Sequence, residues 1–126
     1  MNDLIGLKRA YGAKPGDGSG HVDCCLLAME VHKRLGYHDY APELAWIFEK
    51  YSDETWPRRI IPRWLLQNST RLSGPEPHAV VLLRGATGGA MGTVMDDGTV
   101  LYISEALGVV RTPLPGNFGH YFRMNK

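Results

Sequence analysis

The hydrophobic pattern of this sequence changes once, near Pro77, and that change restricts the possible folds more than any other feature. Before Pro77, apolar residues recur every three or four positions, which is the spacing of amphipathic helices. After it come short apolar runs, with Asp97-Gly98 between two of them as a hairpin signal. This order predicts an α+β fold, with N-terminal helices packed on a C-terminal antiparallel β-meander.

Turn and cap residues bound the expected elements. Asp23 is a good N-cap and Gly36 a natural stop for one helix, and Pro42 suits the first turn of the next. Pro62 is expected to break a third helix into short pieces. We expect helices at 2–10, 24–35, 42–51 and 57–67, strands at 78–84, 92–95, 99–103, 109–112 and 120–124, and Gly-rich turns at 12–20 and 85–89.

Length and composition fit one globular domain over residues 1–126. Hydrophobic residues make up 44% and charged residues 21%, so a core can form without metals or disulfides. The net charge of +1 argues against a nucleic-acid partner, and Arg58, Arg59 and Arg63 fit a solvated helix face. No secretory signal and no bilayer-spanning apolar run is visible, so we expect a protein made in the cytoplasm without membrane insertion.

The two cysteines, Cys24 and Cys25, are adjacent, and we expect both to be free thiols. Cys24 stands at the first turn of the predicted helix, directly after a Gly-rich loop. The partial positive charge of a helix N-terminus favours a thiolate, which is how a cysteine nucleophile is usually activated. A cysteine on the apolar face of a helix is also a common small core residue, so the position alone allows both interpretations.

The segment around Cys24 resembles the NlpC-type cell-wall cysteine peptidases. Their Asp-Cys-Ser-Gly-Leu-Val pattern follows a Gly-rich loop and an upstream tyrosine, and here Tyr11 precedes Asp23-Cys24-Cys25-Leu26-Leu27-Ala28. The resemblance continues in order along the β half. It covers Pro77–Leu83, Ala90–Gly98, Val100–Ile103, Gly108–Arg111 and Tyr121–Arg123.

The resemblance implies a papain-like NlpC-type fold with Cys24 at the nucleophile position. The family's base is the histidine of a His-Val-Gly strand start, and this chain has Ala90 there. The family's orienting residue falls at or next to Tyr102. Alanine cannot accept a proton, so Cys24 is interpreted as a vestigial nucleophile in a degenerate site.

A relocated base is the alternative, with His21, His78 and His120 as candidates. His21 lies just ahead of Cys24, whereas His78 and His120 read as strand-end residues near solvent. His32 and His38 read as surface positions around a helix end. Cys24, Cys25 and His21 lack the C-x-x-C spacing of a zinc site, so we expect no metal and no cofactor.

The chain most resembles the short stand-alone form of this domain found among the tail-tip proteins of long-tailed bacteriophages, and three functions are considered. The first is a structural component of the tail tip of a long-tailed bacteriophage, a pseudoenzyme that travels in the virion tail and binds other tail-tip proteins. The second is an active peptidoglycan peptidase or amidase that aids phage entry, and the third is a module that binds muropeptides. Exposed aromatic residues would make the partner contacts of the first, and the candidates are Trp46, Trp56, Trp64 and Phe118.

Overall fold

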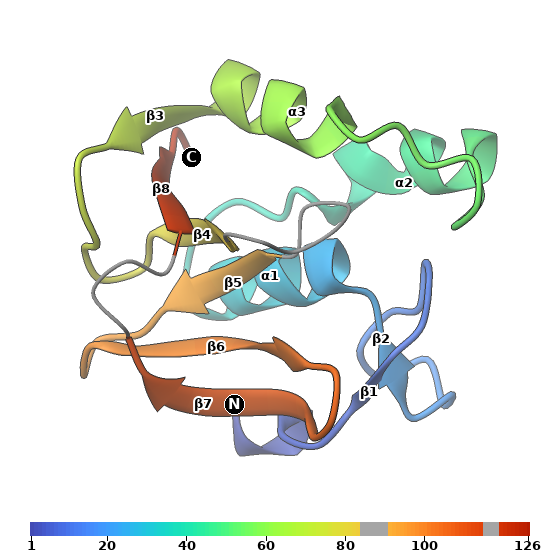
Figure 1. Cartoon of the computed structure of the whole chain (residues 1–126), viewed down its shortest axis with the longest axis horizontal. Coiled ribbons are helices and arrows are strands. Elements are labelled where there is room, and N and C mark those ends of the chain that lie inside the picture. The colour runs from blue at the N-terminus through green and yellow to red at the C-terminus, as the bar shows by residue number, and fades with distance from the viewer. Residues whose placement is uncertain (84–90, 115–118) are drawn as a thin grey trace.

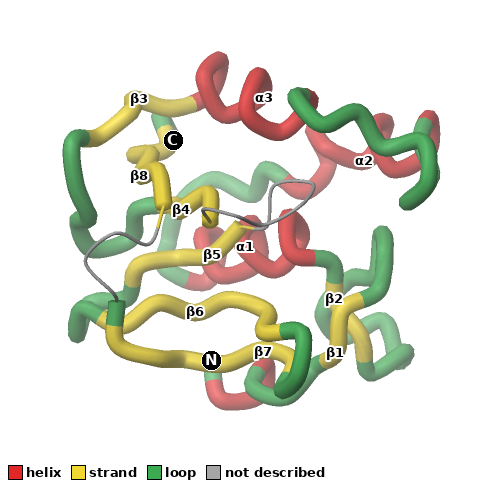
Figure 2. The backbone as a smooth tube through the Cα atoms, viewed as in Figure 1, coloured by secondary structure: helices red, strands yellow, loops and turns green. Residues whose placement is uncertain are grey.

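Three helices packed against a six-stranded antiparallel sheet form this protein, which confirms the predicted α+β class (Figure 1). The structure is a computed structural model that describes residues 1–83, 91–114 and 119–126. The helices are α1 (Cys24–Arg34), α2 (Ala41–Lys50) and α3 (Ile60–Asn68), and a short 3-10 helix precedes them at Asn2–Leu4. Helix α1 runs along β5 and β6, and α3 lies beside β3 and β8 (Figure 2).

The sheet contains the predicted meander and extends beyond it. Its strands are β3 (Ser69–Leu72), β4 (Val80–Leu83), β5 (Met91–Val94), β6 (Thr99–Ser104), β7 (Gly108–Pro113) and β8 (Gly119–Met124), in the order β3-β8-β4-β5-β6-β7. Strands β4 to β7 are a meander with the predicted Asp97-Gly98 hairpin between β5 and β6. Strand β8 returns to pair with β4, and β3, which sequence reasoning missed, pairs with the outer edge of β8.

Two of the expected elements differ from those in the structure. The helix expected at 2–10 is wrong beyond its first turn, because Gly6 has a φ of +90° and Lys8–Arg9 instead forms β1, which pairs in parallel with β2 (His21–Val22). The expected break at Pro62 is also wrong. Pro62 is the third residue of α3, and in the first turn a missing backbone N–H removes no helical hydrogen bond.

Helix α1 begins and ends as predicted, but the exposure of one of its residues differs from the prediction. Asp23 caps it by accepting a hydrogen bond from the Cys25 N–H at 2.9 Å, and Gly36 follows its end with a φ of +98°. His32, predicted to be at the surface, is 2% exposed. Its ring stacks on Tyr37 at 4.6 Å, which covers the face that the helical spacing alone had assigned to solvent.

The core divides between the two faces of the sheet. On the helical side, one cluster joins α1, α2 and α3 to β4, β5 and β8, and a second joins Leu27 and Val31 of α1 to Leu101 and Val109. On the opposite face, Val81, Val100 and Tyr121 form a third cluster. Side chains alternate along a strand, so the residues on either side of Leu101 point away from α1.

Two glycines with the same backbone conformation offer a matched test of packing at the β7 start. Gly98 has a φ of +81° with open space around it, and Gly108 has a φ of +76°. A Cβ on Gly108 would overlap the carbonyl oxygen of Leu7. We expect Gly98→Ala to lower the free energy of unfolding by about 1–2 kcal/mol for the left-handed conformation. Gly108→Ala should lose about 1–3 kcal/mol more through that overlap.

Urea denaturation of the two variants and the wild type measures this difference. Equal losses in both variants would mean that the contact between Gly108 and Leu7 does not form.

Candidate functional site

Cys24 is the first residue of α1, and a buried carboxylate sets its position. The Asp23 side chain accepts hydrogen bonds from the Cys25 N–H and, at 3.2 Å, from the Gly12 N–H. The Asp23 N–H donates to the Ala13 carbonyl oxygen at 2.8 Å. The Gly-rich loop is thereby fixed against the helix N-terminus, with Cys24 half-buried at the junction.

The two adjacent thiols titrate in opposite directions. A hydrogen bond from the Cys25 side chain lowers the pKa of Cys24, and a hydrogen bond from the backbone of Met91 at the start of β5 lowers it further. Burial and the nearby Asp23 carboxylate oppose this shift. The pKa of Cys25 is raised well above its ordinary value because Cys25 supplies that hydrogen bond and is buried. Cys24 is therefore the thiol that becomes a nucleophilic thiolate first.

Arg9 is a site residue that sequence reasoning missed. It lies on β1 opposite Val22 of β2, which brings it beside the start of α1, and its charge lowers the pKa of Cys24. The guanidinium also bonds Asp53 at 2.7 Å. Only the parallel pairing of β1 with β2 brings Arg9 to this place, and no local pattern in the sequence indicates that pairing.

Tyr11, noted as the upstream tyrosine, supports the same corner. Its hydroxyl donates to the Tyr51 carbonyl oxygen at 2.6 Å, and its ring packs edge-on against Phe48 and Trp56. The loop that precedes Cys24 is thus joined to the end of α2.

His21 and His78 both lie away from the Cys24 sulphur. The exposed His21 ring turns back to the Ser19 carbonyl oxygen, 2.7 Å from its Nδ1. The His78 ring lies between the Tyr37 hydroxyl and the Asp96 carboxylate, each at 2.7 Å. The His78 N–H donates to Val94 at the far end of β5, about 10 Å along the strand from the Met91 end that contacts Cys24.

His120 lies on the same sheet face as Met91 but two strands away. It pairs with Leu82 of β4, and Leu82 pairs with Met91 of β5, so about 10 Å separates the backbones of His120 and Met91. The Arg71 guanidinium lies 2.8 Å from His120 Nδ1, so this nitrogen accepts a hydrogen bond and the ring is turned toward β3.

Tyr102, at or next to which the orienting residue was expected, has its side chain on the sheet face opposite α1. Tyr102 alternates with Leu101 on β6 and packs with Val81 and Val100, on the side of the sheet away from α1. It pairs with Gly92, whose missing side chain leaves room for the Tyr102 Cβ. Ala90, the position of the family's base, lies outside the described residues, as does the expected turn at 85–89.

Asp23, Cys24 and Cys25 bring three donor atoms within 4.8 Å of one another, the one such trio in the described part of the chain. Both Asp23 oxygens already accept backbone N–H groups. The Cys25 side chain is buried in the core. We assign no metal to these residues.

The aromatic residues proposed as partner contacts differ in exposure. Trp46 on α2 is 52% exposed, whereas Trp64 on α3 is buried and Trp56 is half-buried against Phe48. Phe118 lies outside the described residues. Trp46 is therefore the described tryptophan that offers most of its surface to a partner.

Comparisons with known proteins found no matching family model, curated protein or solved structure. Among the described residues, no helix has both the length and the apolar character needed to cross a membrane.

The hydrogen bond from Cys25 predicts how Cys24 should react. Iodoacetamide alkylation of Cys24 should rise with pH through a pKa below that of an ordinary cysteine. Cys25→Ala removes the donor and should raise that pKa, whereas Cys25→Ser keeps a hydroxyl donor and should change it less. Mass spectrometry of the modified peptide measures the rate at each pH. A wild-type Cys24 that titrates at or above the ordinary value would contradict this assignment.

The Asp23 carboxylate should matter for stability far more than an exposed one. Asp23→Ala removes the helix cap and leaves the part-buried Gly12 N–H and the buried Cys25 N–H unbonded, a loss of about 2–4 kcal/mol in the free energy of unfolding. Asp53→Ala breaks the exposed ion pair with Arg9 and should cost less than about 1 kcal/mol. Chemical denaturation compares the two variants. Similar losses would show that Asp23 does not join the loop to α1.

Proposed function

We propose that this chain is a structural component of the tail tip of a long-tailed bacteriophage, built on a degenerate NlpC-type cysteine peptidase domain. Support comes from the order of elements along the chain. A Gly-rich loop leads into a helix that begins at Cys24, and the meander from β4 to β7 follows, with its β5 start beside the cysteine. The motifs that resemble the family fall on these elements in the same order.

The observation that carries the proposal is that the histidine contacts seen among the described residues lead away from Cys24. His21, His32, His38 and His78 contact, in that order, the Ser19 and Lys126 carbonyl oxygens, the Glu43 carboxylate and the Tyr37 hydroxyl, and His120 accepts a hydrogen bond from Arg71 two strands from Met91. A cysteine peptidase needs a base to take the thiol proton and to return it to the leaving group. Loss of a triad member typically lowers the rate by ~10⁴-fold in serine enzymes.

The remaining features of the site contribute to folding rather than to turnover. Asp23 caps α1, and Cys25 is 3% exposed within the main core cluster. In this proposal the family's active-site turn persists because it holds the first loop, α1 and β5 together. The exposed Trp46 is a candidate contact for another tail-tip protein.

The lowered pKa of Cys24 favours a second candidate, an active peptidoglycan peptidase or amidase. A thiol that ionises more readily than an ordinary cysteine would retain nucleophilicity. The missing acid–base group would then come from elsewhere in this chain or from a partner, and its titration would appear in the pH–rate profile.

Hydrolysis of peptidoglycan stem peptides separates the two candidates. We expect no turnover above background by the purified chain or by the assembled tail, and the same result for Cys24→Ala. An active NlpC-type peptidase serves as the positive control for the assay. Turnover that is present in the wild type and lost in Cys24→Ala would overturn the structural proposal and support the enzyme.

A further inference from the structure

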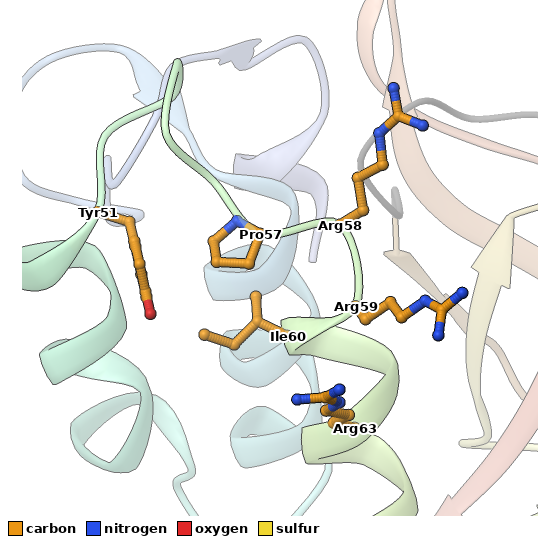
Figure 3. Close-up of a pocket in the computed structure, with 6 residues that line it drawn as sticks. All are labelled: Tyr51, Pro57, Arg58, Arg59, Ile60 and Arg63. Atoms are coloured by element: carbon orange, nitrogen blue, oxygen red, sulfur yellow. The ribbon is translucent and has the colours of Figure 1, made fainter.

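A second candidate site lies between the end of α2 and the start of α3, and it is lined by arginines. The pocket has a volume of about 330 Å³, and its lining residues are Tyr51, Pro57, Arg58, Arg59, Ile60 and Arg63. Figure 3 shows Tyr51 on one side, Pro57 and Ile60 in the middle, Arg58 and Arg59 extending to the side away from Tyr51, and Arg63 below Ile60. The volume lies at the lower end of the range for small ligand sites.

No carboxylate is seen to bond these three arginines, which distinguishes them from four of the other described arginines. Four other arginines each hold an acidic partner within 3.0 Å, and they are Arg9, Arg34, Arg111 and Arg123. Within the described residues, no ion pair or hydrogen bond joins the side chains of Arg58, Arg59 or Arg63 to an acidic group. The solvated face expected from the sequence is therefore a local cluster of uncompensated positive charge.

The N-terminal end of α3, which begins at this pocket, adds its partial positive charge to that of the arginines. Helix α1 starts with the Asp23 carboxylate, and the Ala41 N–H at the start of α2 donates to Asp39 at 3.1 Å. Helix α3 has neither a side-chain cap nor an acidic residue in its first turn, and Arg59 and Arg63 stand there instead. Positive side chains near the positive N-terminal end of a helix are electrostatically unfavourable. A bound anion would therefore reduce the repulsion among the arginines and the repulsion between them and the helix end.

The apolar part of the pocket restricts which anion would bind. The lining also includes Tyr51, Pro57 and Ile60, and none of the six lining residues is acidic. Guanidinium groups bind carboxylates with two parallel hydrogen bonds. Pro57 and Ile60 would contact an apolar neighbour of that carboxylate. A peptide that carries a glutamate or aspartate beside an aliphatic side chain matches both halves of this surface.

We infer that this arginine pocket binds an acidic peptide segment of a protein partner, with a carboxylate on the guanidinium groups and an adjacent aliphatic side chain against Pro57 and Ile60. The inference deepens the proposed function, and rests on it, because the partner would be another tail-tip protein. It does not involve Cys24, so peptide binding can be tested independently of turnover.

The test is a titration of the ¹⁵N-labelled chain with a blocked hexapeptide that has two glutamates flanked by leucines. We expect the peptide to shift the amide resonances of Ile60 and Ile61 in a saturable way. The same peptide with glutamines in place of the glutamates should bind at least tenfold more weakly. Raising the salt concentration should weaken the first peptide more than the second.

Two triple variants of equal charge separate a specific pocket from bulk attraction. Arg58→Gln/Arg59→Gln/Arg63→Gln should weaken binding at least tenfold. Arg71→Gln/Arg111→Gln/Arg123→Gln removes three exposed arginines elsewhere and should change binding less than threefold. Equal losses in both variants, or equal binding of the glutamine peptide, would overturn the inference.

Inorganic phosphate is the competing ligand. If phosphate alone shifted the same amides with the same affinity as the glutamate peptide, the pocket would be a general phosphate site and the peptide assignment would fail. Turnover by Cys24 would remove the proposed tail-tip role but leave the binding result intact. Absence of peptide binding together with absence of turnover would remove only the inference drawn here.

Discussion

The arrangement of the candidate site depends on one buried carboxylate. Asp23 is 4% exposed, and burial raises its pKa. Its hydrogen bonds to the Gly12 and Cys25 N–H groups are the compensation that a buried charge requires. Through them the Gly-rich loop, the start of α1 and the position of Cys24 become one unit. The same carboxylate opposes ionisation of Cys24, so the residue that places the thiol also limits how far its pKa falls.

The elements that were predictable from the sequence are those defined by local chemistry. Asp23 and Gly36 bound α1 because a cap needs an acceptor at one end and a positive φ at the other. Asp97-Gly98 marked the β5–β6 hairpin for a similar reason. Two of the errors involve contacts made at long range. Strand β3 exists because β8 returns to pair with it, and the His32 ring, covered by Tyr37, lies 3.1 Å from the Lys126 carbonyl oxygen at the other end of the chain.

The site itself was predictable to a smaller extent. The place of Cys24 at a helix N-terminus follows from residues 12–24, so local reasoning found it. The roles of Arg9 and Met91 depend on β1 pairing with β2 and on β5 lying beside α1. The orientation of Tyr102 depends on strand alternation, since a residue correctly placed on β6 can still face away from the thiol.

The N-terminal ends of α1 and α3 carry the same kind of partial positive charge, but only α1 has a carboxylate beside it. At α1 the helix N–H groups are satisfied internally by Asp23, and the thiolate that forms beside them must compete with that carboxylate for the positive field. At α3 the side-chain cap is absent and three exposed arginines lie near the helix start, and none of the residues that line the pocket is acidic. An anion that approaches α3 therefore meets the arginines and the helix end without an acidic residue in the pocket lining, whereas one that approaches Cys24 also meets the charge of Asp23.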